Sequence, residues 1–497
     1  MPDTRRPDLV PAARAEARVI KRAFRQAGIN VKTEPAPDGG IAFMYQKGVL
    51  LVRDEDLDRV LSIVARPGAE ILPPVYPEGP FPPERPVLES GREEPGPQGA
   101  DDTGEPPAWR PQLRRVTRGV VALALLGSRY EGEDPRDDDA EPEAERAESG
   151  VLLALNEIDR QLGEGVATPN HVLTVSPVLP CMATEPEEVP PGIEPEPGPC
   201  PGNHGGGVRV FVADTGLVDG AAGAHTWLAG VQGDLDPDPA LVPPGTNPNV
   251  ILPYVGHGTF VAGVLRCMAP AVDLYCANVF NIAGSALEAD AVPKLDAALD
   301  EGYDVFNLTI ASPTRKLLPL TTFDAWRRRL REYEGVACVV AAGNNSSRSR
   351  FWPAAFEGMI AVGALAADGR TRASFSNYGS WVDVYARGRG LVNAWASGTY
   401  DCYVPPIAPG PRQFYGMARC SGTSFSTPIV TGLIASRMSR TGENAVQAAT
   451  AVLARARTRA IPGVGPVVQP CEDGDGRPGD CRDKNCGHRD CPDKECR

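Results

Sequence analysis

Short apolar runs that alternate with amphipathic stretches dominate the second half of the chain, beginning at Val208. The runs read VRVFVAD, VDLYCANVF, DVFNLTIA, VACVVAAGN and MIAVGAL, and amphipathic segments such as EADAVPKLDAALDEG lie between them. This alternation predicts a parallel sheet with helices on both of its faces. Because sites in such sheets form at the carboxyl ends of the strands, the residues that follow each apolar run are the first candidates for chemistry.

Three polar residues stand at such positions. Asp214 ends the run VRVFVAD, His257 opens HGTFVAGVL, and Ser424 lies in SGTSFSTP ahead of an apolar helical stretch. A serine hydroxyl becomes a good nucleophile when an imidazole takes its proton, and a carboxylate fixes the tautomer of that imidazole. A serine at the amino end of a helix also gains backbone N–H groups for a developing oxyanion. The three residues are therefore candidates for an Asp–His–Ser triad.

A fourth candidate, Asn344, ends the run VVAAGN, and its side-chain amide can donate to the same oxyanion. Each of the four residues also has an ordinary structural interpretation. An Asp after a strand is often a turn or cap residue, a His beside Gly-Thr is often structural, a Ser before a helix is often its N-cap, and an Asn after glycine is often a turn residue. The chain has five histidines, and only His257 stands in such a context. Their joint occurrence favours the catalytic interpretation.

These motifs resemble those of the subtilisin-like serine proteases. The likeness rests on Asp214-Thr-Gly, on His257-Gly-Thr-x-Val-Ala, and on the motif from Gly422 to Pro428, Gly-Thr-Ser-x-Ser-x-Pro. Asn344 matches the family's oxyanion asparagine, and the resemblance extends over about residues 205–455. It implies an α/β, three-layer fold with a seven-stranded parallel sheet, and peptide-bond hydrolysis through an acyl-enzyme on the serine. His257 would act as general base and acid, and Asp214 would orient it.

The same resemblance implies an edge with which an extended substrate backbone pairs. That edge consists of Asn307, Leu308, Thr309, Ile310, Ala311 and Ser312. Ala311 and Ser312 replace glycines that are usual in the family, which changes the expected shape of the primary specificity pocket. Two other functions fit the same fold: a peptide ligase or macrocyclase, in which an amine resolves the acyl-enzyme, and a non-hydrolytic peptide-binding protein. The intact triad argues against the second of these.

An insertion at about 396–419 precedes the serine motif and contains several aromatic residues. They are Tyr400, Tyr403, Phe414 and Tyr415. Two interpretations stay open: a selectivity loop that overhangs the cleft, and a surface excursion held by a bridge between Cys402 and Cys420. A second bridge, between Cys267 and Cys276, is also compatible with the sequence, whereas Cys338 in its apolar strand is expected to pack as a small hydrophobe.

The first part of the chain predicts a small α+β unit. Helices are expected at 9–28, 54–65 and 151–165, and strands within 40–52 (two), 116–126 and 170–178. The residues 128–150 form an acidic stretch for which we expect disorder. Four segments result: an α+β unit over 1–182, a Pro/Glu/Gly-rich linker over 183–207, a peptidase domain over 208–460, and a Cys-rich acidic tail over 461–497.

The resemblance implies that residues 1–182 act as a propeptide, which assists folding, blocks the cleft and is removed within 183–207 by self-cleavage. The alternative is a binding or regulatory domain that is never cleaved. On the first interpretation the partners of the peptidase domain are protein or peptide substrates and its own N-terminal domain.

The net charge of −14 and the isoelectric point near 5.0 argue against a nucleic-acid partner. The chain begins without the apolar core of a secretory signal, and it contains no run of 18 apolar residues, so we expect no membrane partner and a cytoplasmic location. Export by a route that needs no such signal is also compatible with the sequence.

The tail poses the question of metals. Its cysteines are Cys471, Cys481, Cys486, Cys491 and Cys496. These cysteines with His488 are only loosely similar to a zinc site, and Asp473, Asp475 and Asp480 do not follow a calcium-loop pattern. We therefore expect disulfides or disorder in the tail, and no required cofactor; calcium lacks a clear motif.

Overall fold

The computed structural model describes residues 10–37, 40–76, 108–131, 149–175, 185–281, 283–402 and 410–470. The acidic stretch after residue 131 and the cysteine-rich tail after residue 470 lie outside the described residues. Within them, no helix is long and apolar enough to cross a membrane.

Seven parallel strands form the central sheet of the second half, in the order β13-β12-β11-β10-β6-β8-β7. They are β6 (Arg209–Asp214), β7 (Gln232–Gly233), β8 (Asp273–Asn278), β10 (Val305–Leu308), β11 (Ala337–Ala341), β12 (Ile360–Leu365) and β13 (Val384–Arg387). The strands β10, β11 and β12 are buried along their whole length. Such burial requires helices on both faces, which is why these strands read as unbroken apolar runs. The predicted parallel sheet is confirmed.

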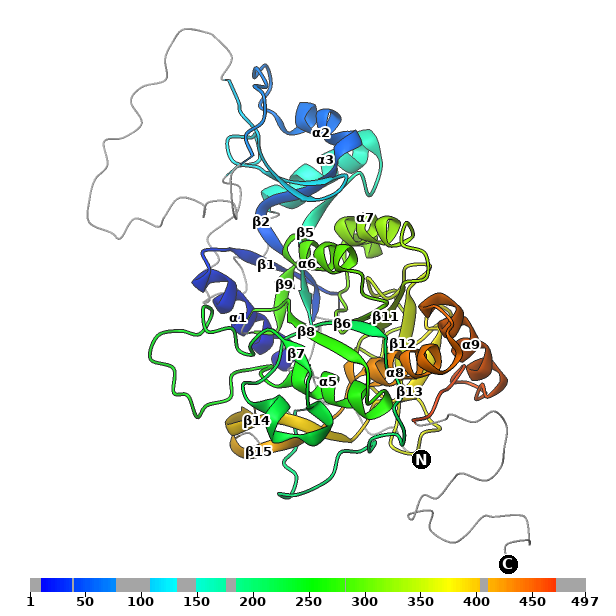
Figure 1. Ribbon diagram of the computed structural model, residues 1–497. Helices are drawn as coiled ribbons and strands as arrows, with labels where there is room; N and C mark the ends of the chain where they lie inside the picture. Colours follow the sequence, from blue (N-terminus) through cyan, green and yellow to red (C-terminus); the bar gives the residue numbers. More distant parts are fainter. Residues whose placement is uncertain are drawn as a thin grey trace, which may run out of the picture.

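Helices cover both faces of this sheet (Figure 1). The helices α5 (His257–Met268) and α8 (Thr423–Thr441) pack together on one face, with α9 (Ala445–Thr458) beside α8. On the other face lie α6 (Glu288–Glu301) and α7 (Thr321–Leu330), and Trp326 of α7 contacts Phe306 of β10 edge to face, at 5.5 Å between ring centroids. Short helical turns occur at α4 (Ala221–Ala224), Thr226–Leu228 and Arg315–Leu317.

The first half of the chain contributes five strands, and the second half contributes β9, to an antiparallel sheet in the order β3-β4-β2-β5-β9, with β1 added to β2. The strands are β1 (Val31–Pro35), β2 (Ile41–Arg53), β3 (Gln112–Thr117), β4 (Val120–Ala124), β5 (Ala167–Thr174) and β9 (Ser285–Leu287). The helices α2 (Leu57–Val64), which follows a turn at Asp54–Asp56, and α3 (Gly150–Leu162) pack on one face around an apolar cluster that includes Leu50, Val60 and Leu155. The opposite face lies on α6 and α7 (Figure 1).

Two strand predictions in this half were wrong, and glycines explain both. The predicted pair of strands within 40–52 is one strand, because Gly48 takes a left-handed backbone (φ 68°) at a register shift instead of a hairpin turn. The single strand predicted at 116–126 begins earlier and is a hairpin, because Arg118 and Gly119 (φ 81°) make a two-residue turn between β3 and β4.

The helix α1 (Val10–Gln26) packs against both halves of the molecule. Its buried residues Ala17, Ile20 and Phe24 share an apolar cluster with Val172 of β5 and Leu287 of β9. Because β9 comes from the second half of the chain, α1 and β5 together cover a surface of the peptidase unit.

The insertion before the serine motif is a long hairpin of β14 (Leu391–Cys402) and β15 (Gly410–Cys420), with a gap in the described residues that includes Tyr403. Cys420 pairs with Leu391 and Cys402 with Gly410, at opposite ends of the hairpin. A bridge between these two cysteines is therefore excluded by their separation along the strands, and that interpretation was wrong.

The predicted Cys267–Cys276 bridge was also wrong. Both residues are buried thiols: Cys276 lies under the turns at Gly216 and Gly258, and Cys267 accepts a hydrogen bond from Asn393 at 3.7 Å. Cys338 is buried in β11, as predicted.

Candidate active site

Asp214 and His257 meet at the carboxyl end of the central sheet. Asp214 is the last residue of β6, His257 is the first residue of α5, and both side chains are fully buried. His257 Nδ1 lies 2.7 Å from Asp214 Oδ1. A carboxylate accepts and does not donate, so Nδ1 carries the proton and Nε2 is left as the basic nitrogen.

Asp214 is held by further donors. The backbone N–H of Thr215 donates to Oδ1 at 2.7 Å, and Thr309 Oγ1 donates to Oδ2 at 2.6 Å. A carboxylate that accepts three hydrogen bonds has a defined orientation and a stabilised negative charge. Thr309 was predicted to line the substrate edge, and the structure places its side chain on Asp214.

Ser424 is the second residue of α8, at the amino end of a helix of 19 residues. The next residue, Phe425, stacks obliquely against His257, at 5.0 Å between ring centroids, and against Phe260 at 4.5 Å. These contacts bring the start of α8 beside the imidazole. The helix start also directs backbone N–H groups and the positive end of the dipole toward the space in front of the serine.

Asn344 follows β11 and reaches the same helix start. Its Oδ1 accepts hydrogen bonds from Thr423 N at 2.9 Å and from Thr423 Oγ1 at 3.0 Å. The carbonyl oxygen of the amide is thereby occupied, and Nδ2 remains as its donor. Gly343, just before it, has a left-handed backbone (φ 97°), and a Cβ there would meet Asn377 Nδ2 at 2.6 Å. Only glycine fits this turn, which explains the Gly-Asn pair after the strand.

Three buried polar atoms of these residues lack a hydrogen-bond partner among the described residues. They are His257 Nε2, Ser424 Oγ and Asn344 Nδ2. Phe425 joins two of these residues, because it contacts the His257 ring and directly follows Ser424. Asn344 joins the same helix start through Thr423.

The predicted substrate edge, 307–312, is buried throughout, and different parts of the molecule cover its two ends. Asn307 and Leu308 belong to β10, and Ile310 is also fully buried. Asn307 accepts a hydrogen bond from Thr431 of α8 at 2.8 Å, so it ties the sheet to that helix. Ala311 and Ser312 contact another chain segment, β5.

β5 lies between this edge and β9, in a place that fits an extended peptide. The Ala311 N–H donates to Thr174 O at 3.4 Å, and Ser312 Oγ donates to Val172 O at 3.1 Å. On its other side β5 pairs with β9, and Val175 N donates to Gly284 O at 3.0 Å. The strand β9 could not be predicted, because a run of three residues gives no periodic signal.

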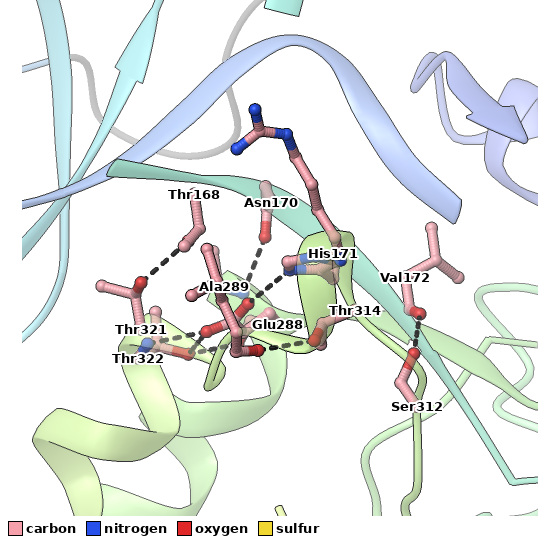
Figure 2. A network of polar contacts seen from close by, with 12 residues as sticks. Thr168, Asn170, His171, Val172, Glu288, Ala289, Ser312, Thr314, Thr321 and Thr322 are labelled. Atoms are coloured by element: carbon pink, nitrogen blue, oxygen red, sulfur yellow. Dashed lines mark hydrogen bonds and ion pairs between the residues drawn. The ribbon is translucent and has the colours of Figure 1, made fainter. Parts of the chain in front are cut away.

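A buried polar network holds β5 against α6 and α7 (Figure 2). His171 Nε2 accepts from the Arg315 N–H at 3.2 Å, and His171 Nδ1 therefore carries the proton and donates to Glu288 at 3.4 Å. The same carboxylate accepts from Thr322 N and Oγ1 at 2.7 and 2.8 Å. Beside it, Asn170 Oδ1 accepts from Ala289 N at 3.1 Å. The network is satisfied only when the two halves are together.

Tyr254 connects His257 to α1. Its carbonyl accepts the His257 N–H at 3.0 Å, its φ is 68°, and its hydroxyl donates to Glu16 at 2.6 Å. Burial raises the pKa of Glu16 to about 8; the bond from Tyr254 lowers it, and the nearby Glu185 raises it. Positive φ is unusual for an aromatic residue, so the turn before His257 is strained and is supported by contacts from the first half.

Within the described residues, no cluster of His, Cys, Asp and Glu has the form of a metal site. The cysteine-rich tail, for which zinc and calcium were weighed, is not part of them.

Comparisons with known proteins show similarity to one family over the second half of the chain. A model of the subtilase family (Peptidase S8) matches residues 205–465, which is more than half of the chain. The chain is 30% identical over 253 residues to subtilisin DY of Bacillus licheniformis, covering 48% of this chain and 79% of that protein. It is 30% identical over 265 residues to subtilisin Savinase of Lederbergia lenta, covering 50% and 84%.

A thermophilic serine proteinase of Bacillus sp. (strain AK1) is 33% identical over 208 residues, which is 39% of this chain and less than half, 45%, of that protein. Among solved structures, a cold-adapted subtilisin-like serine proteinase matches with 23% identity and a TM-score of 0.41, covering 54% of this chain and 90% of that one.

Proposed function

The chain belongs to the subtilase family of serine endopeptidases, and from this premise we propose that it hydrolyses peptide bonds through an acyl-enzyme on Ser424. In this proposal His257 is the general base and then the general acid, Asp214 orients it, and Asn344 stabilises the oxyanion. The observation that carries the proposal is the buried His257–Asp214 pair, at 2.7 Å, beside the helix start that holds Ser424 and that Asn344 contacts through Thr423.

The reaction would proceed in two halves. Ser424 Oγ attacks the scissile carbonyl carbon while its proton passes to His257 Nε2, and the carbonyl oxygen becomes an oxyanion that accepts from Asn344 Nδ2. The carbon–nitrogen bond then breaks as His257 Nε2 protonates the leaving amine. Water repeats the sequence on the acyl-enzyme and releases the acid. Asp214 stabilises the imidazolium in both halves, because its Oδ1 accepts from Nδ1.

We extend the proposal to substrate recognition. An extended peptide would lie where β5 lies, between Ala311 and β9, and would pair with both through its backbone. Backbone pairing of this kind gives affinity without sequence selectivity, and side-chain pockets on alternate residues provide the selectivity. Protein or peptide substrates are therefore the partners that we expect.

The first half of the chain is proposed to be an inhibitory propeptide. Its strand β5 is bonded to Ala311 and Ser312 of the predicted substrate edge. Substrate would be unable to pair with this edge while β5 is docked. Removal of this half, by self-cleavage or by another protease, would open the cleft.

The contacts of the linker favour a particular place for the cut. Glu187 pairs with Arg419 and Glu196 with Val392, so both residues are already held on the β14–β15 hairpin. β5, by contrast, ends in the cleft at Thr174. We therefore expect cleavage between Val175 and Glu185, earlier than most of the linker 183–207.

Intact-mass analysis of the wild-type chain and of Ser424→Ala, each with and without a fluorophosphonate probe, tests the proposal. We expect one probe adduct on wild type only, and loss of about 175–184 N-terminal residues from wild type only. Product mass also separates hydrolysis from cyclisation, because hydrolysis adds one water. An adduct on Ser424→Ala would rule out Ser424 as the nucleophile. An identical cut in both proteins would rule out self-cleavage and leave the hydrolase intact.

A further inference from the structure

A second buried carboxylate, Asp236, lies beside the Asp–His pair. It follows the short strand β7 and is 6% exposed. Asp236 lies 22 residues after Asp214 and 21 residues before His257, and it belongs to none of the three sequence motifs. The mechanism above does not use it.

One oxygen of Asp236 joins the two backbone segments that carry the pair. Asp236 Oδ2 accepts from the Gly256 N–H at 2.8 Å and from Thr215 Oγ1 at 2.7 Å. Gly256 immediately precedes His257, and Thr215 immediately follows Asp214. Thr215 Oγ1 in turn accepts from the Gly258 N–H at 2.9 Å. The backbone on both sides of the histidine is thus tied, through Asp236 and Thr215, to the residue next to Asp214.

Gly256 shows why such a tie is needed. Its backbone is left-handed (φ 97°), and a Cβ there would meet the Trp395 ring at 2.9 Å. Glycine permits this approach but is the most conformationally free residue, so the turn that places His257 gains little rigidity from its own sequence. The Asp236 acceptor on its N–H provides that rigidity, and the bond is about twice as strong when the carboxyl is ionised.

The surroundings of Asp236 are acidic and dry. Burial raises its pKa to about 7, the bonds from Gly256 and Thr215 lower it, and the charge of Asp214 raises it. Asp234 and the Cys276 thiol are the other titratable groups near this site, and burial keeps that thiol protonated by raising its pKa. The charges that raise these two pKa values are all acidic: Asp214 acts on Asp236, and Asp214, Asp236 and Asp234 act on the Cys276 thiol.

We propose that Asp236 is a positioning residue of the active site, which aligns His257 with Asp214 through Gly256 and Thr215 and adds its negative charge to the field that stabilises the imidazolium. The inference rests on the proposed function, since it concerns the same histidine. It deepens that function by adding a second carboxylate, which never touches the reacting atoms. Its effect must therefore appear in the ionisation of His257 and in the rate of the nucleophile, with little effect on substrate affinity.

Three variants separate charge from geometry. Asp236→Asn keeps an oxygen that accepts both hydrogen bonds and removes the charge, whereas Asp236→Ala removes both. Asp234→Asn is the matched control: its carboxylate lies on the same loop and also accepts two bonds, from Asn278 N at 2.8 Å and Tyr275 OH at 2.7 Å, but it contacts neither neighbour of the pair.

The first readout needs no catalysis. The Nδ1 proton of His257 is followed by low-field proton NMR against pH in full-length chains that carry Ser424→Ala and cannot cut themselves. We expect Asp236→Asn to lower the midpoint of the His257 titration by about half a pH unit or more, because a nearby negative charge favours the imidazolium. Asp234→Asn should shift the midpoint much less. An unchanged midpoint in Asp236→Asn would overturn the role of the charge.

The second readout is the rate of fluorophosphonate labelling in chains with Ser424 intact. We expect Asp236→Ala to slow labelling by roughly 10- to 100-fold, and Asp236→Asn to recover most of that loss above the titration midpoint, because a small misplacement of catalytic groups has effects of this size. Labelling of Asp236→Ala at the wild-type rate would overturn the positioning role. If Asp236→Ala does not fold, the Asn variant carries the test. Failure of wild type to label while the NMR midpoint still moves would count against Ser424 and not against Asp236.

Discussion

The core of the peptidase half and its contact with the first half differ in the polarity of their side chains. Inside the peptidase half one continuous apolar cluster extends through all three layers and includes Phe260, Phe306 and Phe425. Across the contact, small apolar clusters, such as those that join Phe24 to Leu287 and Leu51 to Ala289, alternate with polar and charged pairs. Arg53 pairs with Asp324 at 3.3 Å, Arg114 with Asp290 at 2.8 Å, and Thr168 with Thr321 at 2.8 Å.

The difference teaches how the two halves relate. An apolar core cannot be opened without exposing surface that water disfavours, so it keeps its parts together. A polar pair regains hydrogen bonds to water when the contact opens, so the polar part of the contact costs less to open than an apolar core. The buried polar groups around His171 and Glu288 give the docking its specificity, because unpaired buried groups are costly. The polar pairs at the contact agree with the proposed removal of the first half.

The largest expected effect comes from the core of the peptidase half. Phe306 is fully buried in β10, and Phe306→Ala should lower the free energy of unfolding by about 3–5 kcal/mol, through lost transfer energy and the cavity left behind. Urea titration of the full chain in the Ser424→Ala background, followed by circular dichroism, measures it. A loss below about 1 kcal/mol would mean that the core tolerates a cavity and that the contrast between core and contact is overstated.

The next effect depends on pH and concerns the docking of α1. The pKa of Glu16 is raised to about 8 in the docked state from 4.5, so the docked state binds the proton more tightly than the released state. Docking of α1 is therefore strongest below about pH 4.5 and weakens as pH rises toward 8, by at most about 1.4 kcal/mol per pH unit. Hydrogen exchange of residues 10–26, corrected for the intrinsic effect of pH, should show loss of protection over this range.

The matched variant for this prediction is Glu16→Gln, which stays neutral and can still accept from Tyr254. Its protection should remain nearly constant over the same range. If wild type and Glu16→Gln lose protection in parallel, Glu16 does not control the release of α1.

A smaller effect is expected at the buried polar contact. His171→Ala leaves the Arg315 N–H without an acceptor and the Glu288 carboxylate without one donor, which should weaken docking by about 1–3 kcal/mol. Amides of β5 should then exchange roughly 5- to 150-fold faster, while amides of β11 keep their protection. Equal acceleration in β5 and β11 would show that the network stabilises the whole chain and not the contact.

The smallest effect should come from the exposed rim of the same contact. Arg118 pairs with Glu332 at 3.2 Å, but their side chains are 77% and 58% exposed. Arg118→Ala should change docking by less than about 1 kcal/mol, since water and salt screen such pairs. An effect as large as that of His171→Ala would mean that surface charge, and not the buried network, holds the halves together.

The parallel sheet and the four motif residues could be predicted because local signals encode them. The sequences of β10 and β11 are apolar runs because both faces of these strands are covered. Gly343 and Gly422 indicate the turns that precede Asn344 and Ser424. The contacts of Thr309, Asp236 and β9 could not be predicted. Each depends on segments that meet only after the sheet has formed, such as Thr309 with Asp214 across neighbouring strands, and no spacing in the sequence specifies that meeting.

The docking of the linker on the hairpin has a consequence for the proposed inhibition by the first half. While the chain is intact, β5 is tethered a few residues from a segment held at Glu187, so its effective concentration at the cleft is set by a short connection and not by the amount of protein. A cut between Val175 and Glu185 would change no contact described here. Docking of the first half on the peptidase would then depend on the concentration of the two pieces. Dilution would release the peptidase, and a high concentration of the cleaved first half would inhibit it.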